Sequence, residues 1–421
     1  MKRVLMISEH ADPSGPLGAT DAGGQNVYVD QVSRGVVRYG YTVDIYTRAT
    51  TPDAAEPIVW ADGVRIVPVP AGPPGFLPKD AIWQYITEFT TQSMALAARS
   101  GPYDLIHGNF WMSGWVGTEL KRHLRLPLVQ IFHALGVIKR EYQGDADSSP
   151  PERCDVERSV IENADLIIAQ CPAEADDLVR RYGADRARIR VVPSGVDPRR
   201  FFPIPQDAAR AALGLPTEGQ VIVYVGRLQP RKDVENILRG LALLRQAGRT
   251  VPRLLVVGGE TDNALLDQEP EMRRLLGVAA ELGIRDLVTF VGRKPADRLP
   301  LYYSAADAFV STPWYEPYGL TPLEAMACGT PVICSAVGGI TFTVADGETG
   351  FLVPPRHPEA LADRIQALMD NRDVRARMAR NARRRVEELF VWTTVAERTA
   401  AVYTELLEGQ RHGNGASGAP T

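Results

Sequence analysis

The sequence opens with RVLMIS (residues 3–8), a short run of branched and apolar residues, and a run of the same kind, TVDIYT, returns at residues 42–47. Between the two runs a helical pattern extends from about Val27 to Tyr39. Short β-branched runs that alternate with longer helical patterns are typical of βα units around a parallel sheet, so the sequence predicts an α/β fold. Further runs are VRIVPVP (64–70), DLIHG (104–108), PLVQIF (127–132), DLIIAQ (165–170) and RIRVVPSG (188–195).

A proline-rich stretch, PSGVDPRRFFPIPQD (193–207), interrupts this alternation and is typical of an interdomain linker. We expect two doubly wound parallel-sheet domains, residues 1–197 and 198–385, that face each other across a cleft. Residues 386–408 are expected to form a helix that packs back on the first domain, and the Gly/Ser-rich residues 409–421 a disordered tail. The strands expected in the second domain are VIVYVGRL (221–228), PRLLVVGG (252–259), LVTFVGR (287–293), DAFVSTP (307–313) and PVICSA (331–336).

The composition excludes several classes of function. The 421 residues include 47 Lys and Arg against 51 Asp and Glu, and this balance argues against a protein that binds nucleic-acid phosphates. Apolar runs are far shorter than the ~20 residues of a membrane span, and the N-terminus MKRVLMISEH has no signal-peptide cleavage site. We therefore expect a cytoplasmic protein without a membrane segment. The 4 Cys lack C-x-x-C spacing and the 6 His lack an H-E-x-x-H motif, so free thiols and no zinc site are expected.

The most informative motif is EPYGLTPLEAMACGTP (316–331), which crosses a Pro/Gly turn after a strand and enters a short helix. Thr321 fits a helix N-cap, Pro322 the first helical position, and Glu324 the matching position of a capping box. In that interpretation Glu324 is a structural residue.

The same motif also fits an anion site. The backbone N–H groups of Gly319, Leu320 and Thr321 would lie at a helix N-terminus, where the helix dipole favours phosphate. Glu316 would lie at the carboxyl end of a strand, where open α/β sheets bind ligands, and with Glu324 it would flank the anion.

The loop in VGRLQPRKDVENI (225–237) carries two candidate cations. Arg227 and Lys232 flank a Pro turn at the expected carboxyl edge of the sheet, and this arrangement suits a diphosphate. The alternative is a pair of solvated loop cations with Arg231 beside them.

Two further candidates lie in the first domain. The glycines of DAGGQN (21–26) would let the backbone approach a bulky ligand, although a flexible loop is the default interpretation. His133, at the end of PLVQIF, could bind substrate or be structural.

These motifs together resemble the retaining GT-B glycosyltransferases of family 4. The resemblance covers about residues 1–405 in a consistent order, and the nearest branches look like sucrose-phosphate synthase and the mycothiol-pathway enzyme that glycosylates inositol phosphate. It rests on the Glu316–Glu324 pair, the GR-x4-K pattern (226–232), GGQNVY (23–28), FHALG (132–136) and FLPKD (76–80).

The resemblance implies transfer of a hexosyl group from a nucleotide sugar, UDP-linked glucose or N-acetylglucosamine, with a GDP-sugar as the alternative. No cofactor or metal would be needed, and a homodimer is left open. Glu324 would bind the ribose, Glu316 the donor sugar, and Arg227 and Lys232 the diphosphate, with His133 beside the reacting sugar. The other implied donor-binding positions are Gly24, Arg293, Gly319, Leu320 and Thr321.

The implied acceptor is a small sugar, cyclitol or sugar phosphate. The cations Lys79 and Arg153 suit an acceptor phosphate. The inositol-phosphate branch typically has Tyr and Thr where this sequence has Phe110 and Ala134, so two hydroxyl donors are missing. The run from His133 to Gly136 is nearer the sucrose-phosphate branch. The implied acceptor-binding residues are Asn26, Lys79, Phe110, Ala134 and Arg153.

Two charged runs are interpreted as structural and not as ligand-binding sites. The triplet Asp145-Ala-Asp147 has the spacing of a metal-chelating pair, but it lies in a polar loop without a preceding strand, so no metal is predicted. Arg383, Arg384 and Arg385 lie beside Glu387 and Glu388, which indicates a solvated helix face.

Three other functions fit the sequence less well. A dehydrogenase would need a G-x-G-x-x-G turn after a strand, which the sequence lacks. A nucleotide-sugar epimerase of the same architecture would share the diphosphate site but would need more acid/base groups near the sugar. A sugar-binding module without catalysis would not need the paired donor motifs. Nucleotide release that requires an acceptor distinguishes a transferase from an epimerase.

Overall fold

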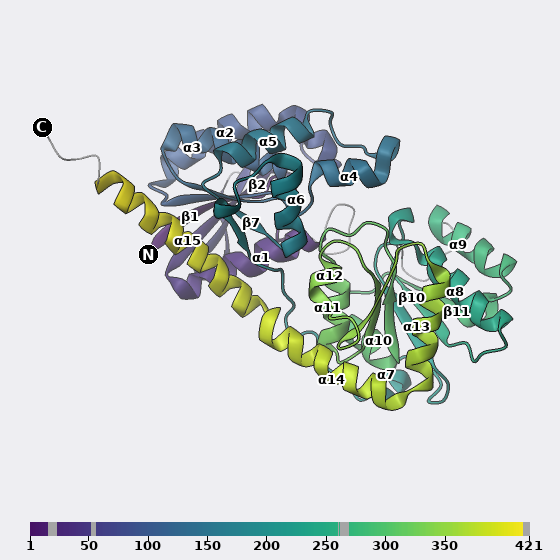
Figure 1. Ribbon diagram of the computed structural model, residues 1–421. Helices are drawn as coiled ribbons and strands as arrows, with labels where there is room; N and C mark the ends of the chain where they lie inside the picture. Colours follow the sequence, from purple (N-terminus) through teal and green to yellow (C-terminus); the bar gives the residue numbers. More distant parts are fainter. Residues whose placement is uncertain (16–22, 52–55, 260, 262–268, 416–421) are drawn as a thin grey trace, which may run out of the picture. The chain divides into compact units, whose positions relative to one another are not determined.

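The computed structural model describes residues 1–15, 23–51, 56–259, 261 and 269–415. The chain forms two compact units, Met1–Pro193 with Trp392–Thr421, and Ser194–Val391 (Figure 1). The boundaries expected after residues 197 and 385 therefore lie at Pro193 and Val391. The reason is local pairing, because the Val196 N–H donates to the Phe390 carbonyl at 2.8 Å and Val196 bridges Val391, which places both crossing segments in the second unit.

The first unit is built on an eight-stranded sheet of order β3-β4-β2-β1-β5-β6-β7-β8, parallel except for the β3–β4 pair. Its strands are β1 (Lys2–Ile7), β2 (Tyr41–Arg48), β3 (Ile58–Ala61), β4 (Val64–Val69), β5 (Leu105–Asn109), β6 (Leu128–Ile131), β7 (Leu166–Ala169) and β8 (Ile189–Val191). Its helices are α1 (Gly24–Val36), α2 (Ile86–Ser100), α3 (Trp111–Leu124), α4 (Gly136–Gln143), α5 (Arg153–Asn163), α6 (Pro172–Tyr182) and α15 (Trp392–Gly415).

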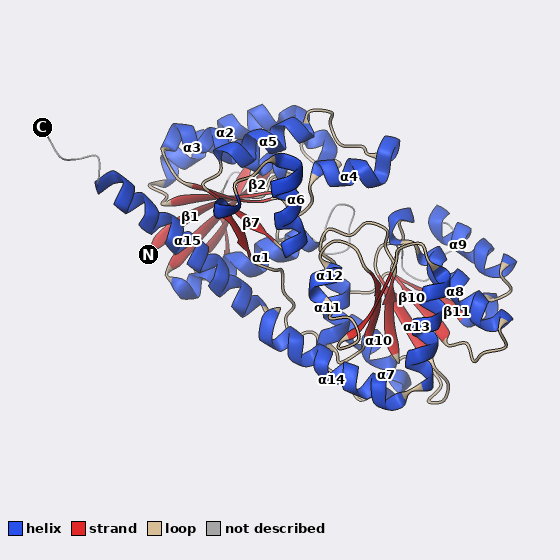
Figure 2. Ribbon diagram, in the orientation of Figure 1, coloured by secondary structure: helices blue, strands red, loops and turns tan. Residues whose placement is uncertain are grey.

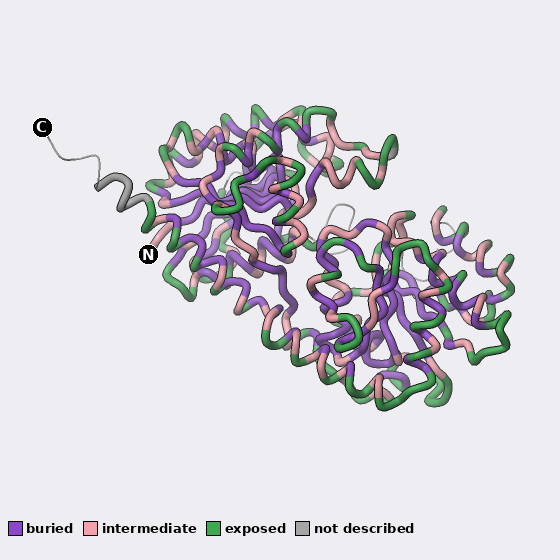
Figure 3. The backbone as a smooth tube through the Cα atoms, in the orientation of Figure 1, coloured by how far each residue is buried: buried purple, intermediate pink, exposed green. Residues whose placement is uncertain are grey.

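Alternation along each strand gives this sheet two cores, because successive side chains point to opposite faces. Val4 and Met6 pack with α1 and α15, whereas Leu5 and Ile7 pack with α2, α3, α5 and α6. Figure 2 shows the helices flanking the sheet, and Figure 3 shows its strands almost wholly buried. Burial on both faces explains why the strands appear in the sequence as nearly continuous apolar runs.

The second unit has a six-stranded parallel sheet of order β11-β10-β9-β12-β13-β14. Its strands are β9 (Val221–Val225), β10 (Arg253–Val257), β11 (Val288–Gly292), β12 (Ala308–Ser311), β13 (Val332–Ser335) and β14 (Gly350–Val353). Its helices are α7 (Gln206–Ala212), α8 (Val234–Gln246), α9 (Pro270–Glu281), α10 (Leu299–Ala305), α11 (Leu320–Ala327), α12 (Ile340–Thr343), α13 (Pro358–Asp370) and α14 (Arg372–Leu389). Helices α8, α9 and α13 pack on one face, and α10, α11 and α14 on the other.

The predicted α/β fold with two parallel-sheet units is confirmed, and so are the free thiols, since Cys154, Cys171, Cys328 and Cys334 are all unpaired and buried. Strands β3 and β14 were not predicted. They are edge strands of only four residues, and β3 exposes Ile58 and Val59, so neither strand has an apolar run long enough to recognise. In the described part of the chain, no helix combines the length and apolar character needed to cross a membrane.

Helix α15 packs against α1 in the first unit. Its contacts include hydrogen bonds between Tyr403 OH and His107 Nδ1 at 2.6 Å and between Tyr41 OH and Thr404 Oγ1 at 2.9 Å. The expected disordered tail over 409–421 is wrong for residues 409–415, because α15 continues to Gly415; residues 416–421 lie outside the described chain. A docked helix extends at low cost, since each added residue joins an existing helix and needs no new nucleus.

The expected solvated face at Arg383–Arg385 is wrong for two of its three residues. Arg383 donates to the carbonyls of Phe201 and Ala327, and Arg385 donates to those of Phe342 and Thr343. Ala327 and Thr343 are the last residues of α11 and α12, whose final carbonyls have no intrahelical donor. The two arginines therefore cap the C-termini of α11 and α12.

Candidate functional site

In the second unit, the loops that follow β9 and β12 meet at the carboxyl edge of the sheet, because these strands are neighbours. There the Lys232 ammonium contacts Glu316 Oε2, and Arg231 Nη1 lies 3.4 Å from the same oxygen. Only 14%, 12% and 16% of the Lys232, Glu316 and Arg231 side chains is exposed. The alternative of solvated loop cations is therefore wrong for Lys232 and for Arg231 beside it, whereas Arg227, the other member of the proposed pair, is exposed.

Burial and charge together set the protonation of this pair. Burial lowers the pKa of Lys232, although the Glu316 charge opposes the shift. Burial alone would raise the pKa of Glu316, but the charges of Lys232, Arg231 and Arg227 outweigh it and hold that pKa below its ordinary value. We call Arg227, Arg231, Lys232 and Glu316 the cation cluster; it brings three basic side chains together around one carboxyl group.

Hydrogen bonds fix the two loops against each other. Thr312 Oγ1 donates to Asp233 O at 3.0 Å, the Trp314 N–H donates to Arg231 O at 3.1 Å, and Arg231 Nη1 donates to Tyr315 O at 3.1 Å. Arg227 is exposed, and its carbonyl accepts from Tyr224 OH at 2.9 Å. The two backbone segments therefore hold the cluster in place without the help of a bound ligand.

The predicted N-cap at Thr321 is wrong. Helix α11 begins at Leu320, its N-cap is Gly319, and no side chain caps it. Gly319 has φ of 87°, a left-handed conformation that glycine adopts readily, and a Cβ there would lie 3.1 Å from Ile340 Cγ1. The N–H groups of Leu320 and Thr321 belong to the first turn, where intrahelical acceptors are lacking.

Glu324 is not part of a capping box. Its Oε2 accepts a hydrogen bond from Tyr303 OH at 2.7 Å. Burial raises the pKa of Glu324 to about 6, and the Tyr303 hydrogen bond partly opposes that shift. Near neutral pH this carboxylate can accept hydrogen bonds from the hydroxyls of a ligand.

Two glycines that the sequence analysis missed support the Glu316 turn. A Cβ on Gly338 would lie 2.0 Å from Glu316 O, and a Cβ on Gly339 would lie 2.7 Å from Tyr318 Cα. The pair lies two residues beyond the end of β13, and two adjacent glycines shortly after a strand were the available signal. Arg293 follows β11, which is separated from β9 by β10, and its side chain is exposed.

In the first unit, His133 follows β6 with a left-handed backbone, φ 59°. Its Nε2 lies 3.3 Å from Asn109 Oδ1, and the Tyr28 ring packs edge-on at 4.9 Å. Burial lowers the pKa of His133 to about 3, so the imidazole is neutral.

Asn26 has a structural role that the sequence analysis did not anticipate. Its Oδ1 accepts from the Gly23 N–H at 2.9 Å, and its Nδ2 donates to Asp12 O at 2.9 Å. These bonds hold the start of α1, whose first residue is Gly24. Asp21 and Ala22 of the same motif lie outside the described residues.

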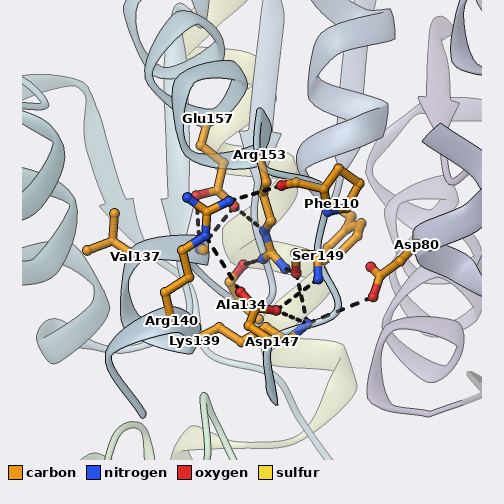
Figure 4. A network of polar contacts seen from close by, with 12 residues as sticks. Asp80, Phe110, Ala134, Val137, Lys139, Arg140, Asp147, Ser149, Arg153 and Glu157 are labelled. Carbon is orange, nitrogen blue, oxygen red and sulfur yellow. Dashed lines mark hydrogen bonds and ion pairs between the residues drawn. The ribbon is translucent and has the colours of Figure 1, made fainter. Parts of the chain in front are cut away.

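Three of the five predicted acceptor-binding residues come together around Arg153 (Figure 4). The Arg153 guanidinium bonds Glu157 Oε1 at 2.8 Å, donates to Ala134 O at 2.6 Å, and lies over the Phe110 ring at 5.1 Å. Glu157 also accepts from the Gly136 N–H at 2.9 Å. Arg153 is only 1% exposed, so it is held inside the unit by its own carboxylate partner.

Lys79 begins the 3-10 helix Lys79–Tyr85, next to Asp80. Asp80 Oδ2 accepts from Ser148 Oγ at 2.7 Å, which ties this segment to the loop after α4. In that loop Asp147 pairs with Lys139 at 2.8 Å and with Arg140 at 3.7 Å (Figure 4). Among the described residues, no three His, Cys, Asp or Glu side chains group as metal ligands.

Comparison with known proteins assigns both units. A glycosyl transferase 4-like domain model matches residues 23–195, and a glycosyl transferases group 1 model matches residues 205–385. D-inositol 3-phosphate glycosyltransferase of Acidothermus cellulolyticus is 39% identical, with 97% of this chain and 92% of that protein covered. The Corynebacterium glutamicum protein of the same name is 35% identical, with 97% and 98% covered.

Solved structures of similar architecture cover nearly the whole chain. Sucrose-phosphate synthase from Thermosynechococcus elongatus is similar with a TM-score of 0.87 and 36% identity, covering 97% of this chain and all (100%) of that one. HepE of Anabaena, solved with UDP-glucose, has a TM-score of 0.74 at 21% identity, with 96% and 100% covered.

Proposed function

The chain belongs to family 4 of the GT-B glycosyltransferases, and from that membership we propose that it moves a hexosyl group from a UDP-sugar to a small phosphorylated cyclitol or sugar. The donor-binding part of this proposal rests on the cation cluster at the carboxyl edge of the second sheet. It holds three cations against one carboxylate, next to the first turn of α11.

This arrangement suits a departing nucleoside diphosphate. Cations and helix N–H groups stabilise negative charge most strongly when they are held in place in a poorly solvated site. Lys232 and Arg231 are mostly buried and held by both loops. Glu324, ionised above pH 6, would accept hydrogen bonds from the ribose hydroxyls. The choice of UDP is supported by HepE, which was solved with UDP-glucose.

The acceptor proposal rests on relatives and on Lys79. The relatives that cover 97% of the chain are named for D-inositol 3-phosphate, and sucrose-phosphate synthase also carries a phosphorylated sugar in its name. Because Arg153 is already paired with Glu157, we propose that Lys79 is the main residue that binds the acceptor phosphate. The epimerase and binding-module alternatives are set aside, because these relatives are named as transferases or synthases.

The test is a matrix of donors and acceptors. UDP-glucose, UDP-N-acetylglucosamine and a GDP-sugar are each incubated with inositol, inositol phosphate and sugar phosphates, and product is detected by mass spectrometry. We expect transfer only with a UDP-sugar and a phosphorylated acceptor. Release of UDP without any acceptor, or equal use of unphosphorylated inositol, would contradict the proposal.

Substitutions test which residues bind the acceptor. Lys79→Ala should raise the acceptor KM roughly 10-fold or more, as expected for a hydrogen bond to a charged group, with the donor KM unchanged. Lys2→Ala, which removes a cation paired with Asp104 in the same unit, is the matched control. Phe110→Tyr combined with Ala134→Thr should improve use of inositol phosphate, because it restores two hydroxyl donors.

A further inference from the structure

The orientation of the Asn109 amide can be assigned from its surroundings. Asn109 is fully buried, and its Nδ2 lies 3.2 Å from Ile7 O and 3.5 Å from His107 O. Backbone carbonyls only accept hydrogen bonds, so the NH2 group must face them. The amide oxygen therefore faces His133 Nε2, at 3.3 Å.

This orientation determines where the His133 proton lies. An amide oxygen cannot donate, so Nε2 must carry the hydrogen. A neutral imidazole has one donor and one acceptor nitrogen, which leaves Nδ1 as the acceptor. Within the described residues Nδ1 has no hydrogen-bond partner and is not fully buried. It is therefore accessible to a ligand.

The groups around His133 keep it neutral. The Tyr28 ring on α1 packs against His133. His107 on β5 and His10 after β1 interact with His133 electrostatically, and Glu174 on α6 interacts in the same way with Tyr28. Burial is the largest influence, and together with the two histidines it places the pKa of His133 at about 3. The left-handed backbone at His133 fixes the direction in which the ring leaves β6.

We propose that Asn109 is a positioning residue that fixes the Nε2–H tautomer of His133, so that Nδ1 accepts a hydrogen bond from a hydroxyl of the sugar substrate. The inference rests on the proposed function for the identity of the ligand. It also restricts the substrate at this point, because the lone pair on Nδ1 attracts a hydroxyl hydrogen and repels a carboxylate. The sugar must therefore present a hydroxyl to His133.

The tautomer can be measured in the free protein. Two-bond ¹H–¹⁵N correlation spectra of histidine-labelled protein distinguish Nε2–H from Nδ1–H, and His133→Asn assigns the signal, since Asn tolerates a left-handed backbone. We expect the Nε2–H pattern in the wild type and a growing Nδ1–H fraction in Asn109→Leu. An Nδ1–H pattern in the wild type, or no change in Asn109→Leu, would overturn the proposal.

The substrate hydroxyl is identified by kinetics with monodeoxy analogues of the transferred sugar. Asn109→Leu should lower kcat/KM roughly 5- to 10-fold with the normal sugar, the loss expected for one hydrogen bond. With the analogue that lacks the partner hydroxyl, the variant should show no further loss. An equal loss with every analogue would indicate a merely structural role and would overturn the proposal.

Asn109→Asp is the second variant, in case the apolar replacement does not fold. Its carboxylate would still accept from Nε2–H but would favour the imidazolium, so an acid limb should appear in the pH profile between pH 5 and 8. An unshifted profile would count against the proposal. If the wild type transfers no sugar from any donor, the proposed function fails, and the spectra still decide the tautomer.

Discussion

Glu316 and Lys232 are 84 positions apart in the sequence, yet their side chains form one mostly buried ion pair. The pair joins the loop after β9 to the loop after β12, and Arg231 shares the same carboxylate oxygen. Glu316 thus reduces the positive charge that the cluster offers to an anionic ligand.

Glu316→Gln should therefore tighten binding of free UDP while slowing transfer. Removing one negative charge beside three cations is expected to improve UDP affinity roughly 3- to 10-fold, about 0.7 to 1.4 kcal/mol. Isothermal titration calorimetry would measure the change. Glu387→Gln is the control, because Glu387 pairs with Arg383, which contacts the last residue of α11, at the other end of that helix from the cluster. Unchanged or weaker UDP binding would show that Glu316 does not modulate the anion site.

Donor affinity should depend on pH through Glu324. With a pKa near 6, the carboxylate is ionised above that pH. Below it the group carries a proton and accepts hydrogen bonds more weakly, so the UDP-glucose Kd should rise as pH falls through 6. UDP-glucose is the suitable probe, because it lacks the terminal phosphate monoester whose second pKa is about 6.

Two variants test whether Glu324 is the group that causes this pH dependence. Tyr303→Phe removes the hydrogen bond that lowers the Glu324 pKa, so the midpoint should move to higher pH. Glu324→Gln should bind weakly at every pH. A midpoint that stays in place in Tyr303→Phe, or persists in Glu324→Gln, would assign the titration to another group.

Much of the fold could be predicted because both sheets are buried on their two faces, and their strands appear as apolar runs that alternate with helices. The cation cluster was only partly predictable. Arg227, Lys232 and Glu316 were recognised by motif, but Arg231 was set aside, because the sequence does not reveal that Trp314 and Tyr315 fold against it.

Long-range contacts also explain the failures. The capping box at Thr321 was locally consistent, yet Gly319 begins the helix and Glu324 bonds Tyr303 from α10 instead. The arginines at 383 and 385 looked solvated, because their carbonyl partners are 42 to 182 positions away. Pairing at such separations leaves no periodic trace in the sequence.

Arg153 should matter for stability more than Lys79 does. Arg153→Ala would leave the Glu157 carboxylate buried without its cation, a change that typically costs about 3 to 5 kcal/mol. Urea denaturation of the full chain would measure this loss, with Lys79→Ala expected to remain within about 0.5 kcal/mol of the wild type. Comparable stability of the two variants would mean that the Arg153–Glu157 pair does not hold α5 as the contacts indicate.

Transfer should survive chelation by EDTA. The diphosphate charge is assigned to the cation cluster and the first turn of α11, and Asp147 is already paired with Lys139 and Arg140. The measurement is the initial rate after dialysis against EDTA, with and without added Mg²⁺ or Mn²⁺. Loss of activity that either ion restores would require a metal site and would reopen the Asp145 and Asp147 hypothesis.

The product should keep the anomeric configuration of the donor, because none of Glu316, Glu324 and His133 is a suitable general base. An inverting enzyme needs a general base near the acceptor hydroxyl. Glu316 is paired with Lys232, Glu324 accepts from Tyr303, and His133, with a pKa near 3, is too weak a base at neutral pH. A same-face route, in which the departing phosphate accepts the proton, uses only the groups that stabilise that phosphate. Proton NMR of the first product decides between them: from an α-linked UDP-glucose, a small anomeric coupling indicates retention, and a large diaxial coupling would contradict it.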